Sequence, residues 1–178
     1  MSVSTLALIG YRGTGKTSVA RLLALRLGWD WVDADVEIEL RAGKSIATIF
    51  ADDGEEAFRN LESQVLGELV AREKTVLALG GGVVLRAGNR ELLRNVSTVV
   101  WLTASPGTLA KRIAADESTA ARRPNLTVAG GMTEITAMLA QREPLYRQCA
   151  TLEVDTENRS PGEVAETIVG RLPEMLRS

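Results

Sequence analysis

The chain has 178 residues, of which 45% are apolar, and this is enough material for one domain with a substantial core. Its formal net charge of −2 gives no electrostatic attraction to nucleic acid or to anionic lipid. The absence of histidine and the presence of one cysteine, Cys149, exclude a Ser-His-Asp triad, a zinc site of paired cysteines and an internal disulfide.

The beginning of the chain bears on location. Residues 1–5 lack the basic region of a secretory signal and lead directly into the first predicted strand. No stretch of the chain approaches the ~18 uninterrupted apolar residues of a membrane-spanning helix. A single thiol fits a reducing compartment, so we expect a cytoplasmic protein.

The first strand, predicted over residues 6–9, is followed by an apolar helical pattern over residues 19–27. Between them stands Gly10-Tyr11-Arg12-Gly13-Thr14-Gly15-Lys16-Thr17, the Walker A pattern in the strand–loop–helix context that it requires. Its glycines allow backbone N–H groups and the helix N-terminus to approach a polyphosphate. Lys16 can reach the β- and γ-phosphates, and the Thr17 hydroxyl can ligate Mg²⁺. The alternative is a glycine-rich turn that binds nothing, and the context favours nucleotide binding.

Gly28 is expected to end the first helix, and residues 29–32 predict a second strand. Asp33 and Asp35 follow at the strand end, where open α/β sheets place their ligands. One carboxylate could orient Mg²⁺ through its water shell, and the other could accept a substrate hydroxyl. The structural alternative is that Asp35 only caps the helix predicted over residues 36–40.

A short helix capped by Ser45 and a long helix from Glu55 to about Arg72 are predicted next. The long helix carries Arg59 and Glu62 three residues apart, so they can form a local pair. On spacing alone, a solvated surface ion pair is the favoured interpretation. The alternative is an arginine that Glu62 holds and aims at a substrate anion.

A buried strand predicted over residues 76–79 ends in Gly80, Gly81 and Gly82. Three consecutive glycines lose much conformational entropy on folding, so they indicate close approach of a ligand to bare backbone rather than a simple turn. Residues 98–102 predict a fourth strand, and Pro106 suits the first turn of the next helix.

Residues 116–131 are polar, contain arginines and lack apolar periodicity, so they are either a surface loop or a lid that closes over phosphates. A helix over residues 132–146, a strand over 152–155 and a helix opened by Pro161 complete the chain. This alternation predicts an α/β fold with a five-stranded parallel sheet and helices on both faces. We expect one domain over residues 1–178, with a substrate-binding region at about 33–62 and a lid at about 116–131.

Taken together, these motifs resemble the shikimate kinase family, and their order and intervals match over essentially the whole chain. The resemblance rests on the Walker A pattern, Asp33-Ala34-Asp35, Phe58-Arg59 with Glu62, Gly80-Gly81-Gly82, Arg122-Arg123-Pro124 and Arg142-Glu143-Pro144-Leu145-Tyr146. It implies a P-loop fold like that of the nucleoside-monophosphate kinases, with strand order 2-3-1-4-5. It also implies ATP-dependent phosphorylation of the 3-hydroxyl of shikimate, a step of chorismate and aromatic amino-acid biosynthesis.

The resemblance also implies roles for individual residues. Lys16, Asp35 and Arg123 would be catalytic, and Thr17 and Asp33 would serve Mg²⁺. Shikimate would contact Asp35, Arg59, Gly80, Gly81, Gly82 and Arg142, with both of these arginines on its carboxylate. ATP would contact Gly13, Thr14, Gly15, Lys16, Thr17, Ser18, the lid Arg123 and Arg159 of the adenine loop.

The segment after Lys111-Arg112 is a few residues longer than the lid of the shortest family members, which leaves the role of Arg112 undecided. Of the two neighbouring arginines Arg122 and Arg123, the following Pro124 favours Arg123 as the lid arginine. We expect a monomer whose partners are ATP and shikimate, with neither nucleic acid nor a membrane. Two alternatives are another P-loop small-molecule kinase, such as a gluconate kinase, and a non-catalytic kinase-like binding domain.

Overall fold

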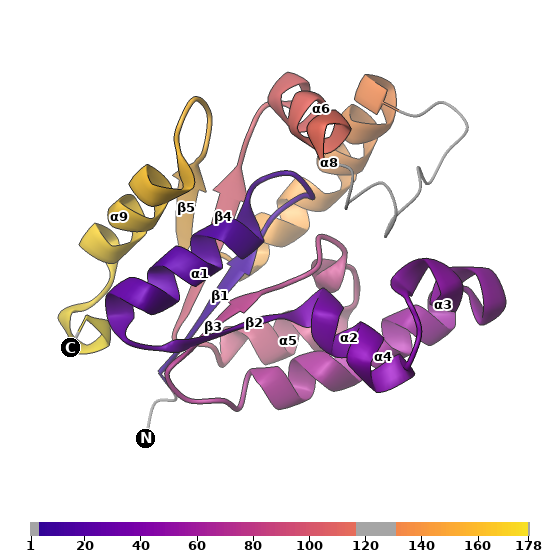
Figure 1. Ribbon diagram of the computed structural model, residues 1–178, viewed down its shortest axis with the longest axis horizontal. Helices are drawn as coiled ribbons and strands as arrows, with labels where there is room; N and C mark the ends of the chain where they lie inside the picture. The colour runs from indigo at the N-terminus through magenta and orange to yellow at the C-terminus, as the bar shows by residue number, and fades with distance from the viewer. Residues whose placement is uncertain (1–3, 117–130, 178) are drawn as a thin grey trace.

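Residues 4–116 and 131–177 are described by the computed structural model, and they form a five-stranded parallel sheet with helices on both faces (Figure 1). The strand order β2-β3-β1-β4-β5 confirms the expected fold class. The strands are β1 (Thr5–Ile9), β2 (Asp30–Asp33), β3 (Thr75–Ala78), β4 (Thr98–Thr103) and β5 (Leu152–Asp155). The helices are α1 (Lys16–Leu27), α2 (Ala34–Ala42), α3 (Ile46–Asp52), α4 (Gly54–Leu69), α5 (Ala87–Arg94), α6 (Pro106–Ala115), α8 (Gly131–Cys149) and α9 (Pro161–Arg171), with short 3₁₀ turns at Val83–Leu85 and Glu174–Leu176.

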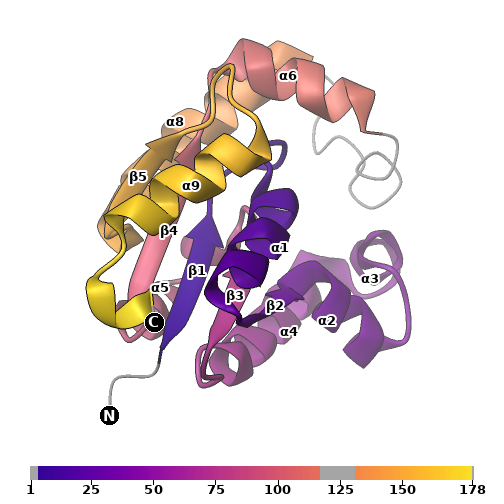
Figure 2. The same cartoon turned by 60° about the vertical axis from the view of Figure 1, so that its left-hand side comes forward.

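The two faces of the sheet have separate cores because successive strand residues point to opposite sides. Leu6 and Leu8 of β1 pack with α1 and α9, which lie side by side on one face (Figures 1 and 2). Ala7 and Ile9 face the other way, toward the core formed with α2, α3, α4, α5 and α8. Burial on both sides explains why the central strands are continuous apolar runs rather than alternating ones.

The carboxyl ends of the central strands meet at bare backbone. Gly10, directly after β1, has φ +140°, and a Cβ there would lie 2.5 Å from the carbonyl oxygen of Leu102 in β4. After β3, a Cβ on Gly81 would lie 3.2 Å from the carbonyl oxygen of Gly10. Glycine at these positions therefore lets three neighbouring strands deliver their following loops to one small region.

Two helix boundaries differ from the sequence-based expectation. The N-cap of α2 is Asp33, whose Oδ1 accepts a hydrogen bond from the backbone N–H of Asp35 at 2.9 Å. The structural alternative, in which Asp35 only caps this helix, is therefore wrong, because the strand ends later and the helix begins earlier than the apolar pattern suggests. The long helix α4 ends at Leu69 rather than near Arg72.

Other boundaries follow their predicted signals. Gly28 ends α1 with φ +65°, and the Ser45 hydroxyl accepts a hydrogen bond from the Thr48 N–H at 3.1 Å to cap α3. The predicted lid falls almost entirely on residues 117–130, including Arg122 and Arg123, which lie outside the described residues. No helix within 4–116 or 131–177 combines the length and apolar character needed to cross a membrane.

The contact between α8 and the end of β3 gives a test of the fold. The buried Tyr146 hydroxyl donates a hydrogen bond to the carbonyl oxygen of Gly81 at 2.5 Å. We expect Tyr146→Phe to lower the free energy of unfolding by about 1–3 kcal/mol, because it leaves a buried carbonyl without this donor. Chemical denaturation measures the change.

Thr136→Ala on the same helix is the matched control, since Thr136 is exposed and donates to the Met132 carbonyl within its own helix. It should change stability by less than about 0.5 kcal/mol. Equal stability of Tyr146→Phe and the control would contradict a structural role for the Tyr146–Gly81 bond.

Candidate active site

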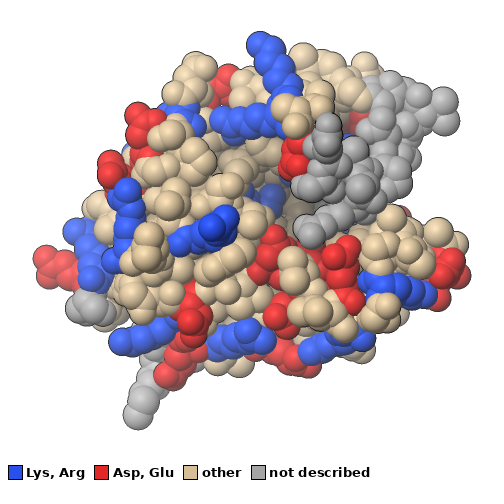
Figure 3. All heavy atoms as spheres, in the orientation of Figure 1, with Lys and Arg blue, Asp and Glu red and all other residues tan. Residues whose placement is uncertain are grey.

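A cavity of about 470 Å³ opens at the carboxyl ends of β1, β2 and β3. In the space-filling view, the same face is hollowed between the region of α6 and that of α2, with basic side chains in the hollow and acidic ones along its lower edge (Figure 3). The lining residues come from segments far apart in the sequence: Arg12, Gly13, Gly15, Lys16, Thr17, Ser18, Asp33, Asp35, Ala78, Leu79, Gly80, Gly81, Arg112 and Asp116.

The phosphate-binding loop (residues 10–17) forms one wall of this cavity. The Lys16 ammonium donates to the carbonyl oxygens of Gly10 at 2.8 Å and Tyr11 at 2.9 Å. Gly15 precedes α1 with φ +89°, a conformation that favours glycine, and so directs the N-terminus of the helix into the site. The Thr14 hydroxyl donates to the Tyr11 carbonyl at 2.8 Å, so that side chain holds the loop itself in shape.

The two predicted metal residues, Thr17 and Asp33, are in contact with each other at the wall of the cavity. Thr17 Oγ1 donates to Asp33 Oδ2 at 2.8 Å, while the other Asp33 oxygen caps α2. A hydroxyl and a carboxylate that already share one side of the site are hard oxygen donors, the kind that Mg²⁺ prefers. The described ranges contain no cluster of three or more His, Cys, Asp or Glu side chains suited to a metal.

Arg59 and Glu62 form a buried pair, which makes the surface interpretation favoured by spacing alone wrong. Arg59 is 9% exposed and Glu62 is 3% exposed, and Arg59 Nη1 donates to Glu62 Oε2 at 2.7 Å. Glu55 adds a longer contact at 3.4 Å. Removing two charges from water costs stability. Sites that bind or react often carry such a cost, and here the pair holds the guanidinium in one place.

The three-glycine segment (residues 80–82) makes room for protein side chains. A Cβ on Gly82 would overlap the Arg59 guanidinium, at 2.8 Å from its Cζ. A Cβ on Gly81 would lie 3.5 Å from Nη1 of Arg142. The described neighbours of this bare backbone are two arginines and the phosphate-binding loop. The approach of a ligand to it, which the three glycines predict, stays a prediction.

Arg142 has an unusual environment for a buried cation. It is almost fully buried, its guanidinium lies 5.7 Å from the centre of the Tyr11 ring, and its Nε has no hydrogen-bond partner among the described residues. Buried charged donors are normally paired. Arg142 is thus positioned beside Gly81, which lines the cavity, with hydrogen-bonding capacity that the described protein does not use.

On the opposite side, Arg112 braces the phosphate-binding loop against the loop after β5. Its Nη1 donates to Thr156 Oγ1 at 2.9 Å and to the Gly13 carbonyl at 3.3 Å, and its Nη2 donates to the Thr156 carbonyl at 2.8 Å. Glu157 fastens the same loop to the start of α6 by accepting hydrogen bonds from Thr108 and Ser105, and these bonds lower the pKa of Glu157 below its usual value.

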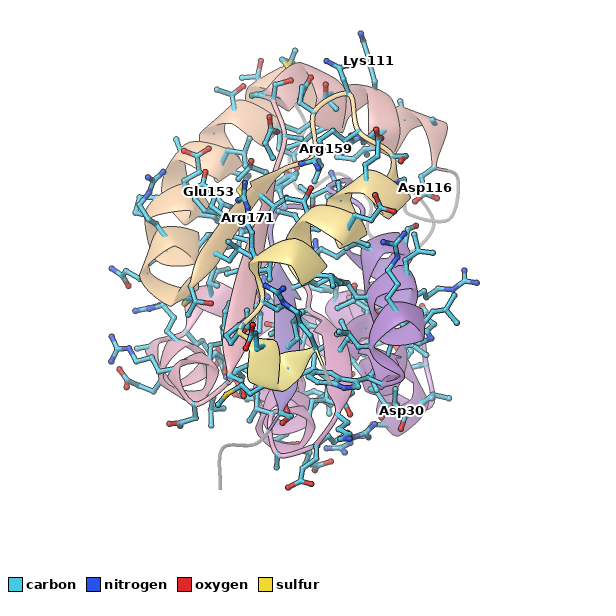
Figure 4. The ribbon with its side chains drawn as sticks, turned by 90° about the vertical axis from the view of Figure 1, so that its left-hand side faces the viewer. Asp30, Lys111, Asp116, Glu153, Arg159 and Arg171 are labelled. Carbon is cyan, nitrogen blue, oxygen red and sulfur yellow. The ribbon has the colours of Figure 1, made fainter. Side chains whose placement is uncertain are left out.

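Not every residue predicted for the site lines the cavity. Arg159 lies between β5 and the first turns of α9, where it donates to the carbonyls of Asp155 and Glu163 and to the Thr167 hydroxyl (Figure 4). Arg12, Arg112 and Asp116 do line it. The Walker A pattern leaves the position of Arg12 open to any residue, so no spacing signal could have selected it.

The family model described as "Shikimate kinase" matches residues 12–173. The chain belongs to the shikimate kinase family. It is 44% identical to a shikimate kinase of Rhodopirellula baltica over 96% of this chain and 91% of that protein. A solved structure, a shikimate kinase from Acinetobacter baumannii in complex with shikimate, superposes with a TM-score of 0.88 at 34% identity over 97% of each chain. As a member of this family, the chain is an ATP-dependent kinase.

A gluconokinase from Sinorhizobium meliloti shares only the fold, at 18% identity and a TM-score of 0.57 over 91% of this chain and 87% of that one. This similarity therefore shows the fold alone. The alternative of a gluconate kinase is not favoured by this comparison.

The contact between Gly82 and Arg59 makes a testable prediction about this shikimate kinase. In Gly82→Ala the new methyl must displace the guanidinium, so KM for the phosphate acceptor should rise roughly 10-fold or more. KM for ATP should stay unchanged, because Gly82 does not line the nucleotide side. Gly88→Ala in α5, where a Cβ would meet open space, is the control and should match the wild type in steady-state assays. If KM for the acceptor is unchanged in Gly82→Ala, Arg59 does not take part in binding the acceptor.

Proposed function

We propose that the chain transfers the γ-phosphoryl group of ATP to the 3-hydroxyl of shikimate, giving shikimate 3-phosphate and ADP for chorismate and aromatic amino-acid biosynthesis. The observation that carries this proposal is Arg142, a buried cation beside the cavity whose Nε lacks a partner among the described residues. A carboxylate on the acceptor would supply that partner. The shikimate complex of the Acinetobacter baumannii relative supports the choice of acceptor.

ATP would bind along the phosphate-binding loop. The backbone N–H groups at Gly13, Thr14, Gly15 and the start of α1 would hold its phosphates, with Ser18 on the same wall. Lys16 would exchange the carbonyls of Gly10 and Tyr11 for the β- and γ-phosphate oxygens. Thr17 and Asp33 would hold Mg²⁺, which when bound would neutralise charge on the phosphates.

Shikimate would occupy the side of the cavity next to the three-glycine segment. Arg59 and Arg142 would bind its carboxylate, and Gly80, Gly81 and Gly82 would leave room for its ring. Asp35, which lines the cavity beside the phosphate-binding loop, would orient the acceptor hydroxyl and take its proton. Phosphoryl transfer depends on positioning and charge neutralisation, so a site without histidine or cysteine is sufficient.

The proposal also covers the domain organisation of the chain, its lid and its adenine loop. Residues 1–178 would act as one kinase domain with a substrate region at about 33–62 and a lid at about 116–131 whose Arg123 contacts the phosphates. Arg159 would contribute to the adenine loop from its place against α9, and Arg112 would hold that loop near the phosphates. We further propose that the enzyme is a monomer. We also propose that it is cytoplasmic, because one cysteine cannot form an internal disulfide and so fits a reducing compartment.

An ADP-release assay with three acceptors in parallel tests the proposal. Shikimate should be turned over, gluconate should not, and shikimate methyl ester should react poorly because it keeps every hydroxyl but lacks the charge. Equal turnover of acid and ester would remove the carboxylate-binding role of Arg59 and Arg142. Turnover of gluconate alone would indicate a different small-molecule kinase, and no turnover at all would favour a binding domain.

Asp35→Asn should lower kcat roughly 10²-fold or more, because it keeps the shape and removes the charge that takes the acceptor proton. ATP affinity, measured by calorimetry, should change little. Asp30→Asn at the opposite end of β2 is the control and should match the wild type. A collapse of ATP binding with a normal rate per bound complex would mean that Asp35 serves the metal and that Asp33 takes the acceptor role.

A further inference from the structure

Arg12 lines the cavity but has no role in the mechanism described so far. Its side chain, 17% exposed, belongs to the phosphate-binding loop and shares the cavity with Lys16 and Asp35. Nucleotide binding by the loop needs its glycines, its lysine and its threonine, and any residue is compatible with the position of Arg12. An arginine there brings a second positive side chain into the loop next to Lys16.

The backbone on both sides of Arg12 is held in place. A Cβ on Gly13 would lie 3.1 Å from Ile113 of α6, so the loop is packed directly against that helix. Tyr11 is buried in a cluster with Leu109 of α6 and Ile135 of α8. The Cα of Arg12 therefore has a fixed position between these two helices and the cavity.

The side chain of Arg12 is held as well. Its Nη2 lies 4.0 Å from Oε1 of Glu134, and the side chain of Glu134 is 2% exposed. Burying a carboxylate is costly unless positive charge compensates it. Glu134 receives such compensation from Arg12 and from its own position in the first turn of α8. The carboxylate thus attracts the Arg12 guanidinium toward the start of α8.

Arg12 and Arg142 occupy different parts of the site. Glu134, which pairs with Arg12, and Arg142 both belong to α8. They are eight residues apart, which is ~12 Å along the helix axis. Arg142 lies beside the three-glycine segment, whereas Arg12 belongs to the loop that would carry the phosphates. Arg12 is therefore suited to the phosphoryl group rather than to the acceptor carboxylate.

We propose that Arg12 is a catalytic residue that binds the transferred phosphoryl group, and that Glu134 is a positioning residue that orients its guanidinium. This inference rests on the proposed function. In the transfer, the bond from the γ-phosphorus to the β,γ-bridging oxygen breaks as the bond to the acceptor oxygen forms, and the acceptor proton passes to Asp35. Charge spreads over the equatorial phosphoryl oxygens. A guanidinium has several N–H donors, so Arg12 can bind those oxygens while it remains paired with Glu134.

The test compares ligands that differ only by one phosphoryl group. In Arg12→Met, we expect weaker binding of a non-hydrolysable ATP analogue and of shikimate 3-phosphate by roughly 10-fold. Binding of ADP and of shikimate should not change. The value of kcat should fall by about 10²-fold, as expected when a donor to transition-state charge is removed. Calorimetry and steady-state kinetics provide these numbers.

Glu134→Gln should also weaken binding of the ATP analogue and of shikimate 3-phosphate and lower kcat. These effects should be smaller than in Arg12→Met, because Arg12 stays charged and loses only its orientation. The double variant Arg12→Met/Glu134→Gln should be no worse than Arg12→Met, since Glu134 acts through Arg12. Arg12→Lys, which keeps the charge without the planar fork, should recover part of the lost kcat. The control is Lys111→Met, whose side chain points away from the molecule on the outer side of α6 (Figure 4), and it should match the wild type.

Each other outcome overturns the inference. An equal loss of ADP affinity would make Arg12 a general nucleotide contact, and a loss of shikimate affinity would assign it to the acceptor. Unchanged affinities and kcat in Arg12→Met would leave it a structural residue. Additive losses in the double variant would remove the positioning role of Glu134. A wild-type enzyme that fails to phosphorylate shikimate would refute the proposed function, while the comparison of the ATP analogue with ADP would still decide whether Arg12 senses the γ-phosphoryl group.

Discussion

The site depends on the contact of bare backbone at the ends of three parallel strands. Gly10 fits against the Leu102 carbonyl with no space for a Cβ, and Gly81 fits against the Gly10 carbonyl so closely that a Cβ would lie 3.2 Å from its oxygen. The buried Tyr146 then ties Gly81 to α8 by a hydrogen bond. This close packing sets the phosphate-binding loop directly beside the three-glycine segment. A phosphate donor and an acceptor bound to these two segments would therefore be neighbours, as in-line transfer requires.

A second feature is the amount of charge that the protein keeps out of water around this contact. Arg59 with Glu62 on α4 and Arg12 with Glu134 at the start of α8 are ionic pairs with buried carboxylates, and Arg142 is a buried cation. Apolar residues of the same volume would make a core at least as stable. The buried charges therefore cost stability. That cost is understandable if anionic ligands complete the site, because positive groups already held in place lose little conformational entropy when a ligand binds.

The sequence predicted helices and strands well where their limits depend on neighbouring residues, as at helix caps and glycine turns. The Walker A pattern identified β1, the phosphate-binding loop and α1, and Gly28 and Ser45 marked a helix end and a helix start correctly. Predictions failed where a boundary or an environment was set by distant segments. Asp33 rather than Asp35 caps α2 because β2 pairs with β3 as far as Asp33. Arg59 and Glu62 have the spacing of a surface pair, but the fold buries them, with the Arg59 guanidinium close to Gly82.

The sequence by itself therefore determined the class of the protein: a parallel α/β sheet, a phosphate-binding loop and chemistry limited to carboxylates, cations and backbone amides. Family resemblance added the acceptor and the order of the strands. Only the tertiary structure decided which arginines gather at the cavity, that Arg159 lies against α9, and that Arg12 lies beside Glu134. The physical reason is the distance along the chain over which each interaction acts. Glycine conformation, capping and apolar periodicity act within a few residues, whereas burial and ion pairing depend on segments that the fold alone brings together.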